Sequence, residues 1–193
     1  RGQLIVHFPT AVYSKEKVVV LAFGDSLTAG YGVKDEESYP SKLQEKISSA
    51  GFPHKVVNAG VSGDTTAGGV RRIRWLMKHE PEIVILALGA TDGLRGLSID
   101  EMRKNLEAII TICREHNARV LLAGMKALPN YGDDYMRNFQ TVFPELAKKN
   151  DLIFLPFLLE GVAGEREQTQ PDGLHPLGSG YSIVTDLIWQ RLE

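Results

Sequence analysis

Short apolar runs alternate along this chain with longer stretches in which apolar residues recur every three or four positions. The runs have the length of buried strands, and the stretches between them have the period of amphipathic helices. This alternation predicts an α/β fold in which helices cover both faces of a five-stranded parallel sheet. The predicted strands are residues 18–23, 55–58, 83–88, 119–123 and 152–155, and the predicted helices are residues 39–50, 66–79, 100–116, 135–149 and 177–191.

The length of the chain fits one domain. A chain of 193 residues buries one substantial core. We therefore expect residues 1–193 to form a single domain. Two connections, residues 124–134 and 156–176, are long, and long connections in compact domains tend to carry function.

Ligands of a parallel sheet bind beyond the carboxyl ends of its strands. Ser26 follows the first predicted strand, in a turn where Gly24 lets the backbone bend. Asp172 and His175 lie three residues apart in PDGLHP, so one loop can present a base and an orienting acid to the same edge. Serine and aspartate are also common turn residues, and these positions alone leave a purely structural role open.

Four blocks of the sequence resemble the GDSL (SGNH) hydrolase family in the order in which that family carries them. They are FGDSLTAGYG, NAGVSGDTT, LGATDGLRG and DGLHP, and they span residues 23–176. The resemblance is greatest to the thioesterase I, lysophospholipase and arylesterase group, because GLRG and LEGVAG are similar to segments of that group. It implies a three-layer flavodoxin-like fold and ester hydrolysis with no cofactor and no metal.

The resemblance also implies roles for particular residues. Ser26 matches the nucleophile, His175 the general base and Asp172 the acid that orients the imidazole. The amide N–H groups of Ser26 and Gly60 match two donors of the oxyanion hole. The third donor of the family is an asparagine, and this chain has Thr91 at that position. We expect Thr91 to be a weaker donor, because its hydroxyl stands on a shorter side chain than an asparagine amide.

An acyl pocket for such a reaction has to be apolar. The expected substrate-binding residues are Asp25, Leu27, Leu94, Leu128, Tyr131, Phe157 and Leu174. The expected function is a serine esterase or thioesterase that forms an acyl-enzyme from aryl or short- to medium-chain fatty esters, acyl-CoA or lysophospholipid.

Three other functions stay open at this point. A carbohydrate O-deacetylase of the same family would carry the same blocks. A binding module that lost activity through the change at Thr91 belongs to a different functional class. A phosphate or flavin binder rests on fold analogy alone, since the sequence has neither a Walker pattern nor GxGxxG.

Composition excludes several classes of partner. The net charge of −2 gives no reason to expect nucleic acid, and the cluster of Arg71, Arg72 and Arg74 reads as a solvated helix face. Cys113 is the single cysteine, so an intrachain disulfide and a structural zinc cluster are excluded. No apolar stretch has the roughly 18 residues of a membrane span.

The compartment and the oligomeric state are less constrained. The first 17 residues, RGQLIVHFPTAVYSKEK, lack the apolar region and cleavage site of a signal peptide. The family resemblance suggests a periplasmic or secreted enzyme, and a cytoplasmic one stays open. The sequence leaves the oligomeric state unknown.

Overall fold

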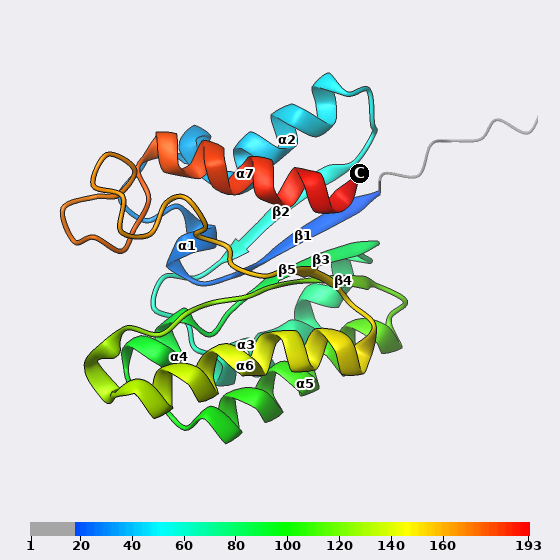
Figure 1. Cartoon of the computed structure of the whole chain (residues 1–193). Coiled ribbons are helices and arrows are strands. Elements are labelled where there is room, and N and C mark those ends of the chain that lie inside the picture. The colour runs from blue at the N-terminus through cyan, green and yellow to red at the C-terminus, as the bar shows by residue number, and fades with distance from the viewer. Residues whose placement is uncertain (1–17) are drawn as a thin grey trace, which may run out of the picture.

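A computed structural model describes residues 18–193 of the chain. Five strands form one sheet in the order β2-β1-β3-β4-β5, and every neighbouring pair is parallel (Figure 1). The strands are β1 (Val19–Gly24), β2 (Lys55–Gly60), β3 (Ile83–Ala87), β4 (Arg119–Ala123) and β5 (Ile153–Leu155). The N-terminal segment, in which we expect no signal peptide, lies outside the described residues.

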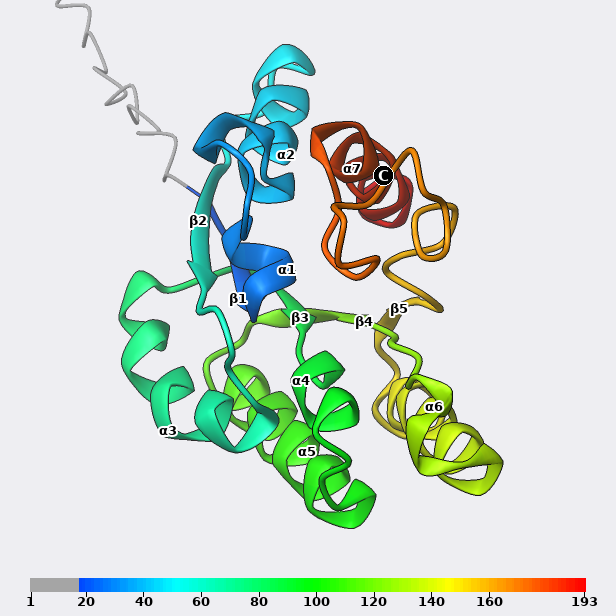
Figure 2. The ribbon, with the colours of Figure 1, turned by 90° about the vertical axis from the view of Figure 1, so that its left-hand side faces the viewer.

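Helices cover both faces of the sheet. Helices α2 and α7 lie side by side on one face, and α3, α5 and α6 lie on the other (Figures 1 and 2). The helices are α1 (Ser26–Ala29), α2 (Tyr39–Ser49), α3 (Thr66–Leu76), α4 (Ala90–Leu94), α5 (Ile99–Glu115), α6 (Asp133–Asn150) and α7 (Gly178–Leu192), with 3-10 turns at η1 (Asp35–Glu37), η2 (Met77–His79) and η3 (Pro129–Tyr131). The expected three-layer α/β fold is confirmed.

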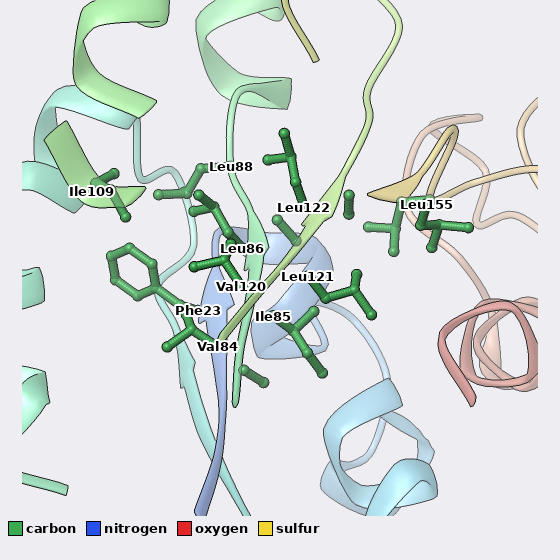
Figure 3. Close-up of a cluster of buried hydrophobic side chains, with 14 of the residues drawn as sticks. Phe23, Val84, Ile85, Leu86, Leu88, Ile109, Val120, Leu121, Leu122 and Leu155 are labelled. Carbon is green, nitrogen blue, oxygen red and sulfur yellow. The ribbon is translucent and has the colours of Figure 1, made fainter. Parts of the chain in front are cut away.

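The central strands are buried because both of their faces are covered. Figure 3 shows the side chains of β3 and β4 packed together with Phe23 of β1 and Ile109 of α5. Cys113 is buried in the same core. Within residues 18–193, no helix combines the length and the apolar character that a membrane crossing needs.

The order of the strands determines where a site can form. Strand β1 pairs with β2 on one side and β3 on the other, so the chain winds outward from β1 in both directions. The carboxyl end of β1 lies in register with those of its neighbours, and Gly24 is opposite both Gly60 and Ala87. In open α/β sheets such a switch of direction leaves a crevice in which ligands bind.

Candidate active site

Ser26 is the first residue of α1, the short helix that follows β1 after a single intervening residue. That residue, Asp25, is the N-cap of α1: its Oδ1 atom accepts a hydrogen bond from the Leu27 N–H at 3.0 Å. The amide N–H of Ser26 has no partner within the helix, because the first N–H groups of a helix lie ahead of its hydrogen-bond ladder. Ser26 therefore presents both a hydroxyl and a free amide N–H at the carboxyl end of β1.

Gly24 is required in this turn for space. A Cβ atom at Gly24 would overlap Thr28 Oγ1 and would lie 2.8 Å from the carbonyl oxygen of Ala87. The sequence led us to expect that Gly24 eases a backbone bend, but its φ is not positive. Close packing between β1, α1 and β3 is the reason for this glycine.

Arg72 of α3 forms hydrogen bonds to the backbone of the same turn. Its guanidinium donates hydrogen bonds to the carbonyl oxygens of Gly24 and Ala59, at 2.9 and 2.7 Å, and pairs with Asp64 at 2.8 Å. It also lies 4.3 Å from the centre of the Phe23 ring. The expectation that Arg72 belongs to a solvated helix face is wrong, because this side chain joins the carboxyl ends of β1 and β2.

His175 and Asp172 complete a chain of hydrogen bonds with Ser26. The Nε2 atom of His175 lies 3.0 Å from Ser26 Oγ, and its Nδ1 atom lies 2.5 Å from Asp172 Oδ2. Because a carboxylate only accepts, Nδ1 carries the ring proton in the neutral imidazole and Nε2 is free to accept from the Ser26 hydroxyl.

The carboxyl group of Asp172 is held in its ionised form. Burial opposes the charge, but hydrogen bonds from the His175 ring and from the backbone N–H groups of His175 and Leu174 outweigh it and lower the pKa of Asp172 to about 2. The loop therefore supplies a permanent acceptor for the Nδ1 proton at neutral pH.

Gln170 and Tyr31 hold His175 in place, and neither role could be predicted from a sequence motif. The Gln170 N–H donates to the His175 carbonyl oxygen at 2.7 Å, and its side-chain Nε2 donates to the carbonyl oxygens of Tyr31 and Pro176, at 2.8 and 3.0 Å. The Tyr31 ring lies 4.7 Å from the imidazole, centre to centre. A side chain at Gly32 would overlap Gln170, which explains that glycine.

A cavity of about 410 Å³ opens beside Ser26 and His175. Five of the expected substrate-binding residues line it, namely Leu27, Leu94, Leu128, Phe157 and Leu174, together with Thr91. The residues that sequence reasoning missed are Ala90, Met125, Lys126, Ala127, Leu159, Ala163, Gly164 and Gly173. The lining is therefore mainly apolar.

Two of the expected substrate-binding residues are placed differently. Tyr131 does not line the cavity; its half-exposed ring packs against Gly96 and lies 5.5 Å from the Tyr135 ring. Asp25 borders the cavity, but its side chain has no exposed surface. The structure thus places Asp25 beneath the floor of the cavity, where it caps α1 without reaching a substrate.

The expected oxyanion donors also need correction. The Gly60 N–H is already taken, because it donates to Asn58 Oδ1 at 2.9 Å. A Cβ atom at Gly60 would overlap the Ala29 backbone, so close packing explains this glycine. Thr91 is half-buried on α4 and lines the cavity, and its hydroxyl has no hydrogen bond to the described residues.

The turn after β2 offers another donor, Gly63. The Asp64 N–H bonds to the Val61 carbonyl oxygen at 3.1 Å, and Gly63 has a φ of 80°, as the third position of a type II turn requires. Within residues 18–193 the Gly63 N–H has no hydrogen-bond partner. The Val61 N–H donates to the Gly24 carbonyl oxygen at 3.1 Å, which fastens this turn beside the one that carries Ser26.

The buried Asp25 carboxyl is the least satisfied polar group near the site. Its Oδ2 atom has no hydrogen-bond partner among the described residues. Burial raises the pKa of Asp25 to about 6, and a positive charge on His175 acts in the opposite direction. Ionised Asp25 is therefore costly to the fold.

A family model for GDSL-like lipases and acylhydrolases matches residues 22–183, nearly all of the described chain. The chain belongs to this family. The resemblance seen in the four sequence blocks is confirmed, and so is the expected class of enzyme, a hydrolase of carboxylic esters.

Characterised relatives of this GDSL-like hydrolase cover almost its whole length. An arylesterase of Vibrio mimicus is 34% identical over 190 residues, which cover 98% of this chain and 95% of the relative. Thioesterase 1/protease 1/lysophospholipase L1 of Escherichia coli strain K12 is 35% identical over 175 residues, 90% of this chain and 83% of the relative.

Solved structures agree with the fold. The crystal structure of TesA superposes with a TM-score of 0.87 at 35% identity, covering 91% of this GDSL-like hydrolase and 98% of TesA. AlinE4, described as an SGNH-hydrolase family esterase, has a TM-score of 0.78 at 43% identity, covering 92% of this chain and 95% of AlinE4.

Proposed function

We propose that this chain hydrolyses fatty acyl esters and thioesters through an acyl-enzyme formed on Ser26. The observation that carries the proposal is the unbroken series of hydrogen bonds from Ser26 through His175 to Asp172 at the edge of an apolar cavity. A nucleophile, a base and an orienting acid within hydrogen-bond reach are the minimum for this chemistry.

In the acylation step, Ser26 Oγ attacks the carbonyl carbon of the substrate while His175 Nε2 takes the hydroxyl proton. Asp172 keeps the proton on Nδ1 and stabilises the imidazolium that forms. The tetrahedral intermediate then collapses, and His175 gives the proton to the departing alkoxide or thiolate. Water, deprotonated by the same imidazole, attacks the acyl-enzyme and releases the acid and free Ser26.

The developing oxyanion needs hydrogen-bond donors that are in place before the reaction. The free N–H of Ser26 at the start of α1 supplies one. The N–H of Gly63 supplies the second in place of Gly60, because it is unpartnered and its turn is fastened to Gly24. The Thr91 hydroxyl, with its short reach, is a poor third donor.

The acyl chain occupies the cavity beside Ser26. Its volume of about 410 Å³ lies in the range of small-molecule sites, roughly 300–1,000 Å³. The names of the characterised relatives, an arylesterase and a thioesterase, support ester and thioester substrates. An acetyl group would leave most of this apolar volume without contacts, which disfavours the O-deacetylase.

A chain-length series of p-nitrophenyl esters tests the proposal. We expect kcat/KM to rise by up to about fourfold for each added methylene while the chain still finds apolar surface, and then to level off. Ser26→Ala is the control and should lose at least about 10⁴-fold in kcat on every ester. Covalent labelling of Ser26 by an organophosphonate would argue against a binding module. A preference for acetylated sugars over the longest esters would favour the O-deacetylase.

A further inference from the structure

Lys126 supplies an exposed positive charge at the mouth of the otherwise apolar cavity. It lies three residues beyond the end of β4, between Met125 and Ala127, which are both buried. The backbone on both sides of Lys126 is thus anchored in the protein, while its own side chain is exposed. Lys126 therefore has a defined place at the rim.

The loops after β4 and β5 are fastened to each other, which places Lys126 beside Phe157. The Gly124 N–H donates to the Leu155 carbonyl oxygen at 2.8 Å, and the Leu158 N–H donates to the Gly124 carbonyl oxygen at 3.0 Å. The ammonium of Lys126 lies 4.6 Å from the centre of the Phe157 ring, within the range of a cation–π contact. This contact holds the charge over one wall of the cavity.

No acidic side chain in the described part of the chain, residues 18–193, neutralises this charge. None of the ion pairs among residues 18–193 includes Lys126. The other ionisable groups that border the cavity are Asp25, which is fully buried, and His175, which is engaged with Ser26 and Asp172. An anion at the mouth of the cavity would therefore find Lys126 as its partner.

We propose that Lys126 binds an anionic phosphate on the leaving alcohol or thiol of the substrate and so selects phosphate-bearing esters and thioesters. The inference rests on the proposed function. With the acyl chain in the apolar cavity and its carbonyl carbon at Ser26, the charged part of a substrate has to lie outside, because burying an unpaired charge is costly. Lysine serves as a point charge for phosphate and tolerates varied geometry.

The test compares three substrates with the same acyl chain: octanoyl-CoA, 1-octanoylglycerol 3-phosphate and neutral p-nitrophenyl octanoate. The readout is the ratio of kcat/KM for each anionic substrate to that for the neutral ester. Lys126→Met removes the charge and keeps a long side chain, and Lys126→Arg keeps the charge. The matched control is Lys148→Met, because Lys148 is an exposed lysine on α6.

We expect Lys126→Met to lower the ratio about fivefold for at least one anionic substrate, mainly through KM, as for a partly exposed ion pair. Lys126→Arg and Lys148→Met should leave the ratio within about twofold, and added salt should reduce the wild-type ratio. The phosphate of CoA and that of the lysophospholipid are distinguished by which ratio falls.

An unchanged ratio in Lys126→Met, or a wild-type ratio that added salt does not reduce, would overturn the role of Lys126. Hydrolysis of the neutral ester would in both cases leave the proposed esterase intact. If the wild-type protein hydrolysed none of the three substrates while Ser26 stayed unlabelled by an organophosphonate, the proposed function itself would fail, and the role of Lys126 with it.

Discussion

The turn that carries Ser26 and the loop that carries His175 meet at one hydrogen bond, but they are attached to the protein by different means. Around Ser26, the side chains of Asp25 and Thr28 are fully buried, Thr28 bonds to the buried Tyr39 at 2.9 Å, and Arg72 holds the carbonyl oxygen of Gly24. Ser26, the proposed nucleophile, thus stands on the core of the sheet.

The loop of residues 156–177 contains no helix or strand. Its first part has fully buried side chains, but residues 170–175 are exposed or half-buried. An isolated bridge joins Thr169 to Pro176 within the loop, and the Gln170 side chain ties the loop to Tyr31. Asp172 at its tip has 39% of its side chain exposed. Segments with few buried contacts open at a lower free energy than core segments.

This difference separates the two properties that a mutation can change. Substitutions of the residues that support Ser26, such as Asp25, Thr28 and Arg72, disturb groups that the core depends on, so they affect stability as well as activity. Substitutions that loosen the His175 loop cost little stability, but they displace the base from a geometry in which a shift of about 1 Å can cost about 100-fold in rate.

The largest expected effect comes from removing either end of the hydrogen-bonded pair. Ser26→Ala and His175→Ala should each lower kcat by about 10⁴- to 10⁶-fold, because members of a catalytic unit act together. The free energy of unfolding of both variants should lie within about 1 kcal/mol of the wild-type value, since neither side chain is fully buried. Steady-state kinetics on a p-nitrophenyl ester and thermal unfolding measure the two quantities, and residual activity near the wild-type level would exclude this mechanism.

Arg72→Met tests how much the contacts of Arg72 with the turn that carries Ser26 contribute to the stability of the protein. The variant leaves the Ala59 carbonyl oxygen and Asp64 without the Arg72 donor and removes one of two donors to the Gly24 carbonyl oxygen, so the free energy of unfolding should fall by about 2 to 4 kcal/mol. Arg71→Met, which changes the exposed neighbour, should change it by less than about 0.5 kcal/mol. Urea unfolding compares them, and equal stability of the two variants would contradict the assigned role of Arg72.

Asp25→Asn tests the cost of the buried carboxyl through its pH dependence. With a pKa of about 6 in the folded protein and 3.8 as its ordinary value, Asp25 binds more protons when folded than when unfolded between these pH values. The free energy of unfolding therefore falls as the pH rises through this window, by at most about 3 kcal/mol. Asparagine keeps an acceptor for the Leu27 N–H and removes the titration.

The variant should accordingly gain stability relative to the wild type between pH 4 and pH 8. Its difference in Tm from the wild type should be more positive at pH 8 than at pH 4. Asp172, whose pKa is lowered, changes its contribution below about pH 4 and does not interfere. A difference in Tm that is the same at both pH values would show that Asp25 does not titrate in this window.

Thr91→Asn should strengthen the hydrogen bonding to the oxyanion. Asparagine carries its donor about one bond, or roughly 1.5 Å, farther from the backbone than threonine does. Hydrogen bonds to an oxyanion weaken steeply beyond about 3.1 Å, so the longer amide should raise kcat by about tenfold with little change in KM. Steady-state kinetics on one short-chain aryl ester compare kcat of the variant with that of the wild type. An equal or lower kcat in the variant would indicate another third donor to the oxyanion, or a substrate to which Thr91 is adapted.

The sequence predicts the fold better than it predicts the contacts that hold the site residues in place. Apolar runs such as β3 read directly as buried strands, and the blocks around Ser26, Asp172 and His175 point to the edge where the structure brings these residues together. The short helices α1 and α4 have too few residues to show a period. Arg72 was misjudged because its partners on β1 and β2 are known to be neighbours only once the strand order is known. Gly60 was misjudged because the sequence does not show that the Asn58 side chain on the same strand turns back to accept its N–H.

Gln170 is the clearest case of a contact that a linear pattern hides, because its side chain bonds to Tyr31, 139 residues away. We expect Gln170→Ala to lower kcat about fivefold, because the loop that positions His175 loses two hydrogen bonds of modest net strength. The free energy of unfolding should change little, since these bonds lie near the surface of a loop.

Gln44→Ala is the matched control, because Gln44 also makes two hydrogen bonds to the backbone, with His54 and Val56, far from the site. It joins α2 to the start of β2, so its loss should lower the Tm at least as much as Gln170→Ala and leave kcat unchanged. Measuring kcat and Tm for both variants separates a positioning role from general support. The two variants could instead lose activity and stability in the same proportion. The loop that carries His175 would then depend on the core as much as the turn that carries Ser26 does.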